Sequence, residues 1–213
     1  MEKDFWLERW ELEQIGFHQD EVNLHLQQHG SRLGSRVFVP LCGKSQDMSW
    51  LARQGAEVLG VELSTIAVRA YFDERGLSAT CSPCGKFDSH EAEGIRILCG
   101  DFFDLGRDDL KGVSAVYDRA SMIALPPGMR ERYVRHLMSI LPEGAKILLI
   151  TLDYPQAEMQ GPPFAVSVDE VQRLYRDFAG IELLEQADVL EQRFAERGVT
   201  RMQENVFLLT RAG

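Results

Sequence analysis

Residues 36–62 are the stretch that most narrowly limits the fold of this chain. An apolar run leads to a single glycine, Gly43, and a stretch with helical spacing follows it. A second apolar run ends in Glu62, about 20 residues after the glycine. This order predicts a βαβ unit of a parallel sheet, in which ligands bind at the carboxyl ends of the strands.

The same alternation continues along the chain. Glycine and proline separate short apolar runs from stretches with helical spacing. The segments expected as strands are 36–42, 57–62, 95–100, 113–118 and 146–154, and those expected as helices are 46–54, 65–75, 129–140 and 168–178. Residues 181–190 and 201–211 are extended segments joined by a short polar stretch, so we expect them to pair antiparallel. The chain is therefore predicted to be an α/β protein with a mostly parallel sheet, an antiparallel strand near the C-terminus and helices on both faces.

The length of the chain suits one domain. The 213 residues are enough for one α/β domain with a sizeable core and short for two. We therefore expect a single domain over residues 1–213. Residues 1–30 precede the first strand and carry helical spacing, in which Trp6 and Trp10 are by themselves typical of the apolar stripe of a packed helix.

Charge excludes some classes of partner. The formal net charge is −10 and no stretch is strongly basic, which disfavours nucleic acid and anionic membranes as partners. The N-terminal segment lacks the basic region and apolar core of a secretory signal, and the longest apolar run, residues 147–152, is too short to cross a bilayer. We expect a cytoplasmic protein.

The four cysteines do not predict a metal site. Cys81 and Cys84 form a C-x-x-C, which could be half of a zinc site or a redox pair. Zinc needs two more ligands, and the sequence has neither a second C-x-x-C nor an H-x-x-x-H; His90 is the nearest histidine. We interpret all four cysteines as free thiols and expect no metal.

The single glycine after the first strand limits the choice of nucleotide ligand. Gly43 would let the backbone approach a ligand closely, and the Glu62 carboxylate could accept from both hydroxyls of a ribose. A pyrophosphate needs several glycines at a helix N-terminus, so a nicotinamide-dependent oxidoreductase is disfavoured. S-adenosylmethionine lacks a pyrophosphate and suits the pattern. At the third strand end, Asp101 could accept from the adenine amino group and Phe102 could stack on the ring, although Asp101 could instead be a helix N-cap.

Several longer strings resemble one family. "FWLERW", "PLCGKSQDM", "VLGVELS", "DRASMIALPP" and "GPPF" stand in the order found in the thiopurine S-methyltransferase family, and the resemblance covers residues 4–211. The chain is similar to bacterial members. The resemblance implies a Rossmann-like class I methyltransferase with a seven-stranded sheet, S-adenosylmethionine as co-substrate, and S-methylation of aromatic and heterocyclic thiols. Residues 77–94 have little distinctive pattern.

The resemblance also implies roles for individual residues. Trp10, Leu41, Glu62 and Arg119 would line the cofactor site, and residues 1–30 would cover it. Arg119 and Arg193 would lie towards a small thiol acceptor and orient it, and a monomer is expected. No general base is assigned, because heteroaromatic thiols are already partly ionised near neutral pH; His18 is interpreted as a capping or solvated histidine.

Two alternatives stay open at this point. The same site could methylate small selenium or tellurium compounds, and the sequence does not identify the physiological acceptor. The chain could also be a non-catalytic protein that binds S-adenosyl ligands, against which the presence of both arginines and the N-terminal aromatic residues argues.

Overall fold

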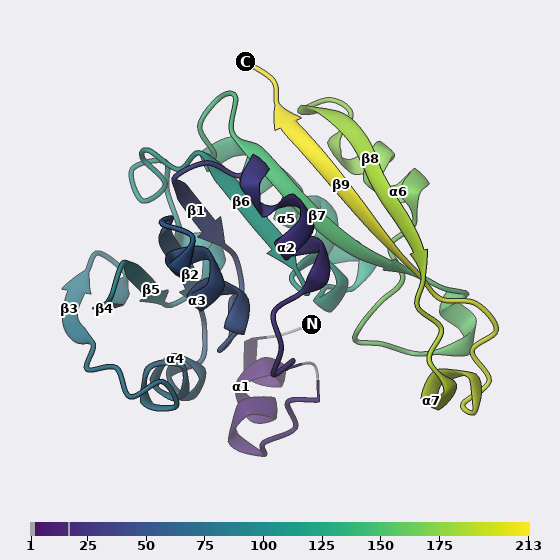
Figure 1. Cartoon of the computed structure of the whole chain (residues 1–213), viewed down its shortest axis with the longest axis horizontal. Helices are drawn as coiled ribbons and strands as arrows, with labels where there is room; N and C mark the ends of the chain where they lie inside the picture. Colours follow the sequence, from purple (N-terminus) through teal and green to yellow (C-terminus); the bar gives the residue numbers. More distant parts are fainter. Residues whose placement is uncertain (1–2, 17) are drawn as a thin grey trace. The chain divides into compact units, whose positions relative to one another are not determined.

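The computed structural model describes residues 3–16 and 18–213, and the chain divides into two compact units. The first unit is Met1–Tyr117 and the second is Asp118–Gly213. Figure 1 shows the course of the chain with its helices and strands labelled.

The first unit contains the predicted βαβ arrangement. Its strand order is β3-β4-β5-β2-β1-β6, and β1 pairs parallel with both β2 and β6, as β2 does with β5. The helices after β1 and β2 start at serine caps, because the Ser45 side chain accepts from the Asp47 N–H and the Ser64 side chain from the Ala67 N–H. The elements of this unit are α1 (Lys3–Glu11), α2 (Leu24–His29), η1 (Gly30–Arg32), β1 (Arg36–Val39), α3 (Gln46–Arg53), β2 (Glu57–Glu62), α4 (Thr65–Asp73), β3 (Thr80–Cys84), β4 (Phe87–Ala92), β5 (Ile95–Cys99), η2 (Phe102–Asp104) and β6 (Ala115–Arg119), whose last two residues belong to the second unit.

The expected count of seven strands with one antiparallel strand is wrong. The described residues form nine strands, and the two additional ones are β3 and β4, a hairpin over the stretch 77–94 that lacked a clear pattern. β4 pairs antiparallel with both β3 and β5, so antiparallel pairing is not confined to the C-terminus. The reason is burial: β3 is an edge strand with four exposed residues and one half-buried residue, so it needs no apolar alternation.

Glycine at position 100 lets the hairpin pack on the sheet. A Cβ at Gly100 would lie 2.6 Å from the Phe87 ring, so a larger residue would displace it. Phe87, the first residue of β4, is buried against this glycine just after the end of β5. One buried aromatic residue therefore anchors the hairpin to the carboxyl edge of the parallel strands.

The second unit contains the predicted C-terminal antiparallel pair. β9 lies between β7 and β8 and pairs antiparallel with both, which Figure 1 shows in yellow and green. Its elements are η3 (Met122–Ala124), α5 (Pro127–Ile140), β7 (Lys146–Asp153), η4 (Gln156–Glu158), α6 (Val168–Tyr175), β8 (Ala179–Asp188), α7 (Gln192–Ala195) and β9 (Gln203–Arg211). A small core of Tyr154, Val199 and Met202 supports the long connection between β8 and β9.

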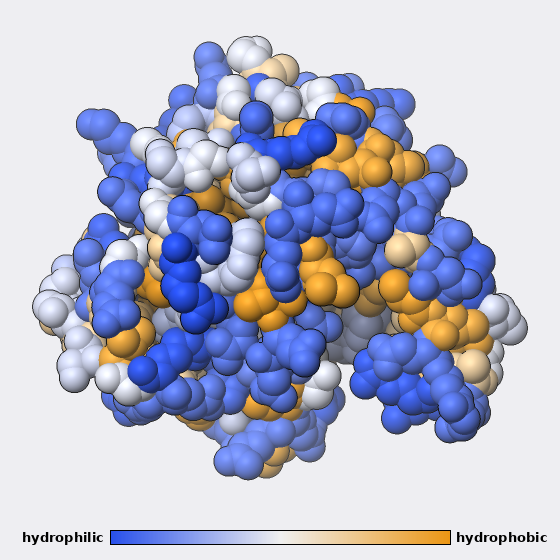
Figure 2. Space-filling view, in the orientation of Figure 1, coloured by the Kyte–Doolittle hydropathy of each residue, from blue (hydrophilic) through white to orange (hydrophobic). Residues whose placement is uncertain are grey.

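The surface is predominantly hydrophilic on the face drawn in Figure 2, where hydrophobic residues lie in separate patches. Among the residues that the structure describes, no helix combines the length and the apolar character that a membrane crossing requires.

Candidate functional site

The carboxylate of Glu62 lies at the carboxyl end of β2 and is held by two backbone donors. The Gly43 N–H donates to one oxygen at 2.9 Å, and the Ser64 N–H donates to the other at 2.8 Å. A carboxylate offers about four lone pairs, more than these two bonds use. The remaining capacity on the two oxygens suits a pair of adjacent hydroxyls, as in a ribose.

The charge of Glu62 is set by two opposing effects. Only 7% of the residue is exposed, and this burial raises the pKa of its carboxyl group above the ordinary value. The hydrogen bonds from the Ser64 and Gly43 backbone act in the opposite direction. Because burial dominates, further donors supplied by a ligand would stabilise the ionised form.

The turn that follows β1 has an unusual backbone. Leu41 has φ +44° and Gly43 has φ +50°, and a left-handed conformation costs a non-glycine residue about 1 kcal/mol or more. The Cys42 N–H donates to the Val61 carbonyl at 3.0 Å, which ties the turn to β2. Such a conformation at a strand end is typical of ligand sites, and here it faces the Glu62 carboxylate.

Trp10 brings the N-terminal helix to this turn. A Cβ at Gly43 would lie 3.3 Å from the Trp10 Cζ2 atom, so the indole packs directly against the glycine, and Trp10 is 6% exposed. α1 is also anchored at the end of β5, where the Lys3 ammonium lies 2.6 Å from the Asp101 carboxylate. The structure therefore brings together Trp10, Gly43 and Glu62, which the sequence predicted for one site.

Asp101 and Phe102 have structural partners in the first unit. The Asp101 side chain caps η2 by accepting from the Phe103 N–H at 3.0 Å, which is the alternative considered from the sequence. Phe102 is 3% exposed and stacks on Phe38 of β1, with 6.5 Å between ring centroids. Their contacts with adenine stay predictions.

Arg119 ends β6, and the turn that follows it belongs to the second unit. Ala120 has φ +66°, and the buried Asp118 carboxylate accepts from the Tyr133 hydroxyl at 2.7 Å and the Met122 N–H at 3.3 Å. Burial raises the pKa of Asp118, and the Tyr133 bond opposes this shift. Arg119, the last residue of β6, is half-buried.

Arg193 lies in α7 and is largely exposed. Its guanidinium is 2.9 Å from the Glu191 carboxylate and stacks over the Phe194 ring at 4.8 Å. α7 belongs to the connection between β8 and β9, whose residues pack around Tyr154. The contacts that the structure gives Arg193 are with its neighbours in sequence.

Comparison with known proteins identifies the family. The family model of thiopurine S-methyltransferase matches residues 1–212. A thiopurine S-methyltransferase of Nitrosospira multiformis is 56% identical over 215 residues, 98% of each chain. One of Pseudomonas fluorescens is 51% identical over 213 residues, 97% of this chain and 98% of the other.

The chain belongs to the thiopurine S-methyltransferase family.

Solved structures share the fold of this family member at low identity. A methyltransferase from Anabaena variabilis, described as S-adenosylmethionine-dependent, has a TM-score of 0.68 at 12% identity over 98% of this chain and 94% of its own. The 1,6-didemethyltoxoflavin-N1-methyltransferase of Burkholderia thailandensis has a TM-score of 0.66 at 13% identity over 99% of this chain and 87% of its own. The fold is therefore the Rossmann-like fold of class I methyltransferases.

The two cysteines of the C-x-x-C in this chain do not face each other. Side chains alternate along a strand, so Cys81 and Cys84 point to opposite faces of β3. The Cys81 thiol lies 3.1 Å from His90 Nδ1, and the Cys84 thiol accepts from Arg96 at 3.1 Å. Both thiols are free, and residues 3–16 and 18–213 contain no group of three or more potential ligands arranged to hold a metal ion.

His18 is partly buried, with 13% of its side chain exposed, and lies 3.5 Å from Asp20. Burial and, secondarily, the Lys44 charge lower the pKa of His18. These surroundings favour its neutral form.

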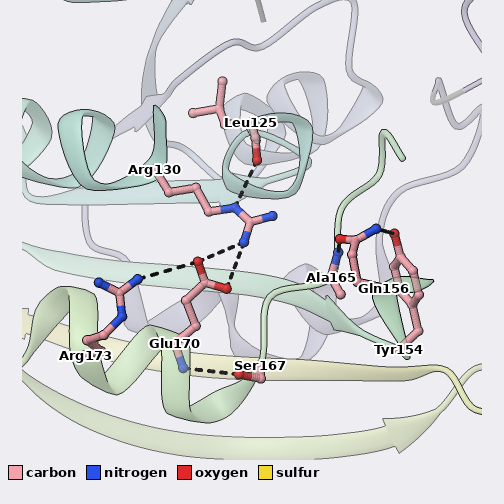
Figure 3. Close-up of polar contacts among 8 residues, drawn as sticks. All are labelled: Leu125, Arg130, Tyr154, Gln156, Ala165, Ser167, Glu170 and Arg173. Carbon is pink, nitrogen blue, oxygen red and sulfur yellow. Dashed lines mark hydrogen bonds and ion pairs between the residues drawn. The ribbon is translucent and has the colours of Figure 1, made fainter. Parts of the chain in front are cut away.

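Sequence reasoning missed a polar cluster around one buried cation, Arg130, in this family member. Figure 3 shows Arg130 of α5 between the Leu125 carbonyl and Glu170 of α6, with Tyr154 and Gln156 beside the loop that leads to Ala165. One signal was available: Arg130 lies three residues before Tyr133 in the helix expected over 129–140, so the two share a helix face, and Tyr133 is an aromatic residue of the kind that packs inward. A charged residue at that spacing is expected to be buried with a partner.

Proposed function

We propose that this protein transfers a methyl group from S-adenosylmethionine to the sulfur of an aromatic or heterocyclic thiol. The observation that carries the proposal is the single-glycine turn at Gly43, which donates to the buried Glu62 carboxylate and is covered by Trp10. Membership of the thiopurine S-methyltransferase family supports the reaction and the class of acceptor.

The donor set of the first unit fits S-adenosylmethionine. The free lone pairs of Glu62 would accept from the ribose hydroxyls, and the backbone at Leu41 and Gly43 would lie beside the rest of the ligand. We assign Asp101 and Phe102 to the adenine, and Trp10 to the cover over the site. When bound, S-adenosylmethionine supplies an electrophilic methyl group on a sulfonium and leaves as a neutral thioether.

The protein's task in this reaction is to align the acceptor. Transfer is an in-line displacement, so the sulfur and the methyl carbon must be held within about 3–3.5 Å along one line. We assign this task to Arg119 and Arg193 from the family resemblance. An arginine keeps its charge and can orient a thiolate or a carboxylate substituent without removing a proton. No base is assigned; the lowered pKa and the Asp20 contact of His18 give no reason to assign one there.

We propose that residues 1–30 form a cover over this site. Trp10 lies on the Gly43 turn and Lys3 is paired with Asp101, so α1 contacts two of the three strand ends proposed to bind the ligand. Closing such a segment over a bound ligand would exclude water. We further expect one functional domain over residues 1–213, acting as a cytoplasmic monomer on a small molecule, without nucleic acid or membrane partners.

Two measurements on the purified protein test the proposal. Calorimetric titration should show binding of S-adenosylhomocysteine and none of NAD at the same concentration. Incubation of the protein and S-adenosylmethionine with a panel of aromatic thiols should give products that are heavier by one methyl group. Binding of S-adenosylhomocysteine without any methylated product would favour a non-catalytic protein that binds S-adenosyl ligands. Tighter binding of NAD would overturn the cofactor assignment.

The alternative acceptors need the same assay. Small selenium or tellurium compounds are softer nucleophiles that the same site could methylate. Comparing kcat/KM for an aromatic thiol and for a small selenium compound would identify the preferred class.

A further inference from the structure

Arg130 is a buried charge whose partners come from two other segments. It is 1% exposed, its Nε–H donates to the Leu125 carbonyl at 2.9 Å, and its Nη1 donates to both Glu170 oxygens at 2.8 Å (Figure 3). Its Nη2 has no hydrogen-bond partner among the residues that the structure describes. A buried ion pair contributes little net stability compared with apolar residues, so its presence calls for another explanation.

The guanidinium holds the loop that contains Phe164. Arg130 Cζ lies over the Phe164 ring, 5.9 Å from its centroid, within the range of a cation–π contact. The Phe164 N–H donates to the Ile123 carbonyl at 2.7 Å, and Ile123 and Leu125 lie in and just after η3. Arg130 therefore connects η3, the Phe164 loop and the first turn of α6.

The loop that contains Phe164 also makes contacts with Gly161, Tyr154 and Gln156. A Cβ at Gly161, where φ is +70°, would lie 2.7 Å from the Phe164 ring. The Tyr154 hydroxyl donates to the Pro163 carbonyl at 2.5 Å, and Gln156 accepts from the Ala165 N–H at 2.9 Å. Phe164 is nevertheless partly exposed. The loop thus presents a partly exposed aromatic ring that lies against Gly161 on one side and under the Arg130 guanidinium.

We propose that Arg130 is a positioning residue for the acceptor, acting through Phe164 as a fixed aromatic wall for a planar heterocycle. This inference rests on the proposed function. η3 follows the carboxyl end of β6 and the Phe164 loop follows that of β7, and ligands bind at such strand ends in sheets of this class. A guanidinium over one ring face draws electron density from the ring, which favours stacking of an electron-rich thiolate.

The test uses three variants and one matched control, with S-adenosylmethionine at saturation and, as acceptor, a heteroaromatic thiol that carries no carboxylate substituent. Phe164→Leu removes the ring and keeps an apolar side chain, Glu170→Gln weakens the partner of the guanidinium, and Arg130→Met removes the charge. Arg173→Gln is the control, because Arg173 lies 3.9 Å from the same Glu170 carboxylate but is 58% exposed.

Phe164→Leu, Glu170→Gln and Arg130→Met should each raise KM for the acceptor about tenfold or more, with S-adenosylhomocysteine affinity unchanged. Arg173→Gln should leave both values unchanged. The double variant Arg130→Met/Phe164→Leu should be no worse than the poorer single variant, because both act on one wall. If Arg130→Met does not fold, the double variant Glu170→Gln/Phe164→Leu tests in the same way whether the ion pair acts through Phe164.

Two results would overturn the inference. Folded variants with a lower melting temperature but unchanged acceptor KM would show that the cluster only stabilises the unit. Additive effects in the double variant would show that Arg130 does not act through Phe164. Failure of the wild-type protein to methylate any thiol would instead contradict the proposed function.

Discussion

Replacing Glu62 by glutamine tests the cofactor site most directly. The two carboxylate oxygens accept from the Gly43 and Ser64 backbone at 2.9 and 2.8 Å. A glutamine has one acceptor oxygen, and its NH2 group would face one of these N–H donors. The variant therefore loses one backbone contact and one acceptor for the ribose, while the volume of the side chain is kept.

The magnitude follows from these contacts. A hydrogen bond to a charged acceptor is worth about 1.5–3 kcal/mol, so S-adenosylhomocysteine should bind about ten- to hundredfold more weakly. The unsatisfied backbone donor should lower the free energy of unfolding by about 1–3 kcal/mol. Removing a buried charge offsets part of that loss, so the variant is expected to remain folded.

The pH dependence has a definite sign. Burial raises the pKa of Glu62 above its ordinary value of 4.5, so the folded protein binds this proton more tightly than the unfolded chain. The contribution of Glu62 to stability is therefore largest below 4.5, falls as the pH rises towards the folded pKa, and is constant above it. Ribose hydroxyls donate to the ionised form, so ligand affinity should change in the opposite direction and increase with pH through that window.

Calorimetric titration with S-adenosylhomocysteine from about pH 5 to about pH 8 measures the change in ligand affinity, and denaturant unfolding over the same pH range measures the change in stability. The matched control is Glu57→Gln, the same substitution at the exposed first residue of β2. The wild-type protein should release protons on binding at the lower pH values, and the Glu62→Gln variant should not. A folded Glu62→Gln variant with wild-type affinity would show that the ribose lies elsewhere.

Three further predictions concern the cover, the acceptor and the thiols. Amides of α1 should exchange more slowly when S-adenosylhomocysteine is bound, and the difference should shrink in Trp10→Leu; equal exchange in the two wild-type states would contradict a cover. Arg193→Met should raise KM for a carboxylated aromatic thiol more than for a neutral one, since only the former loses a charge partner; an equal fall in kcat for both would refute an orienting role. Cys81 should be alkylated first, as followed by mass spectrometry, whereas Cys42 and Cys99 should react only on unfolding, because burial raises both pKa values, that of Cys99 to about 11.

The βαβ unit could be predicted because its signals are local. The expected strand 57–62 coincides with β2, and Glu62 ends it as the pattern required. The first strand was expected over 36–42 but ends at Val39. The positive φ of Leu41 ends it, and such a conformation in a leucine has no sequence signal. The family strings, not the periodicity, brought Leu41 into the predicted site.

The hairpin of β3 and β4 and the partners of Asp101 could not be predicted, because they depend on tertiary contacts that have no local sequence pattern. β3 is an edge strand that buries little, so its residues carry no alternation. Whether Asp101 caps a helix or binds adenine could not be decided without knowing that its side chain accepts from the Phe103 N–H. Its ion pair with Lys3 likewise depends on where α1 packs. Contacts between residues that are distant in sequence were therefore the part of the structure that the sequence predicted least.

Arg130 shows where a sequence signal was present and could have been used. The helix carries several cations, of which Arg130 is buried, whereas Arg135 is exposed and pairs with Glu131 one turn away. Spacing already separates them, because Arg130 shares a helix face with Tyr133. A buried arginine requires an acid, and the one it meets, Glu170, lies in the first turn of α6, where a negative charge is also favoured by the helix dipole. A cation on an apolar stripe together with an acid at a later helix start therefore predicts a tertiary link between the two helices, and here that link reaches the loop proposed to bind the acceptor.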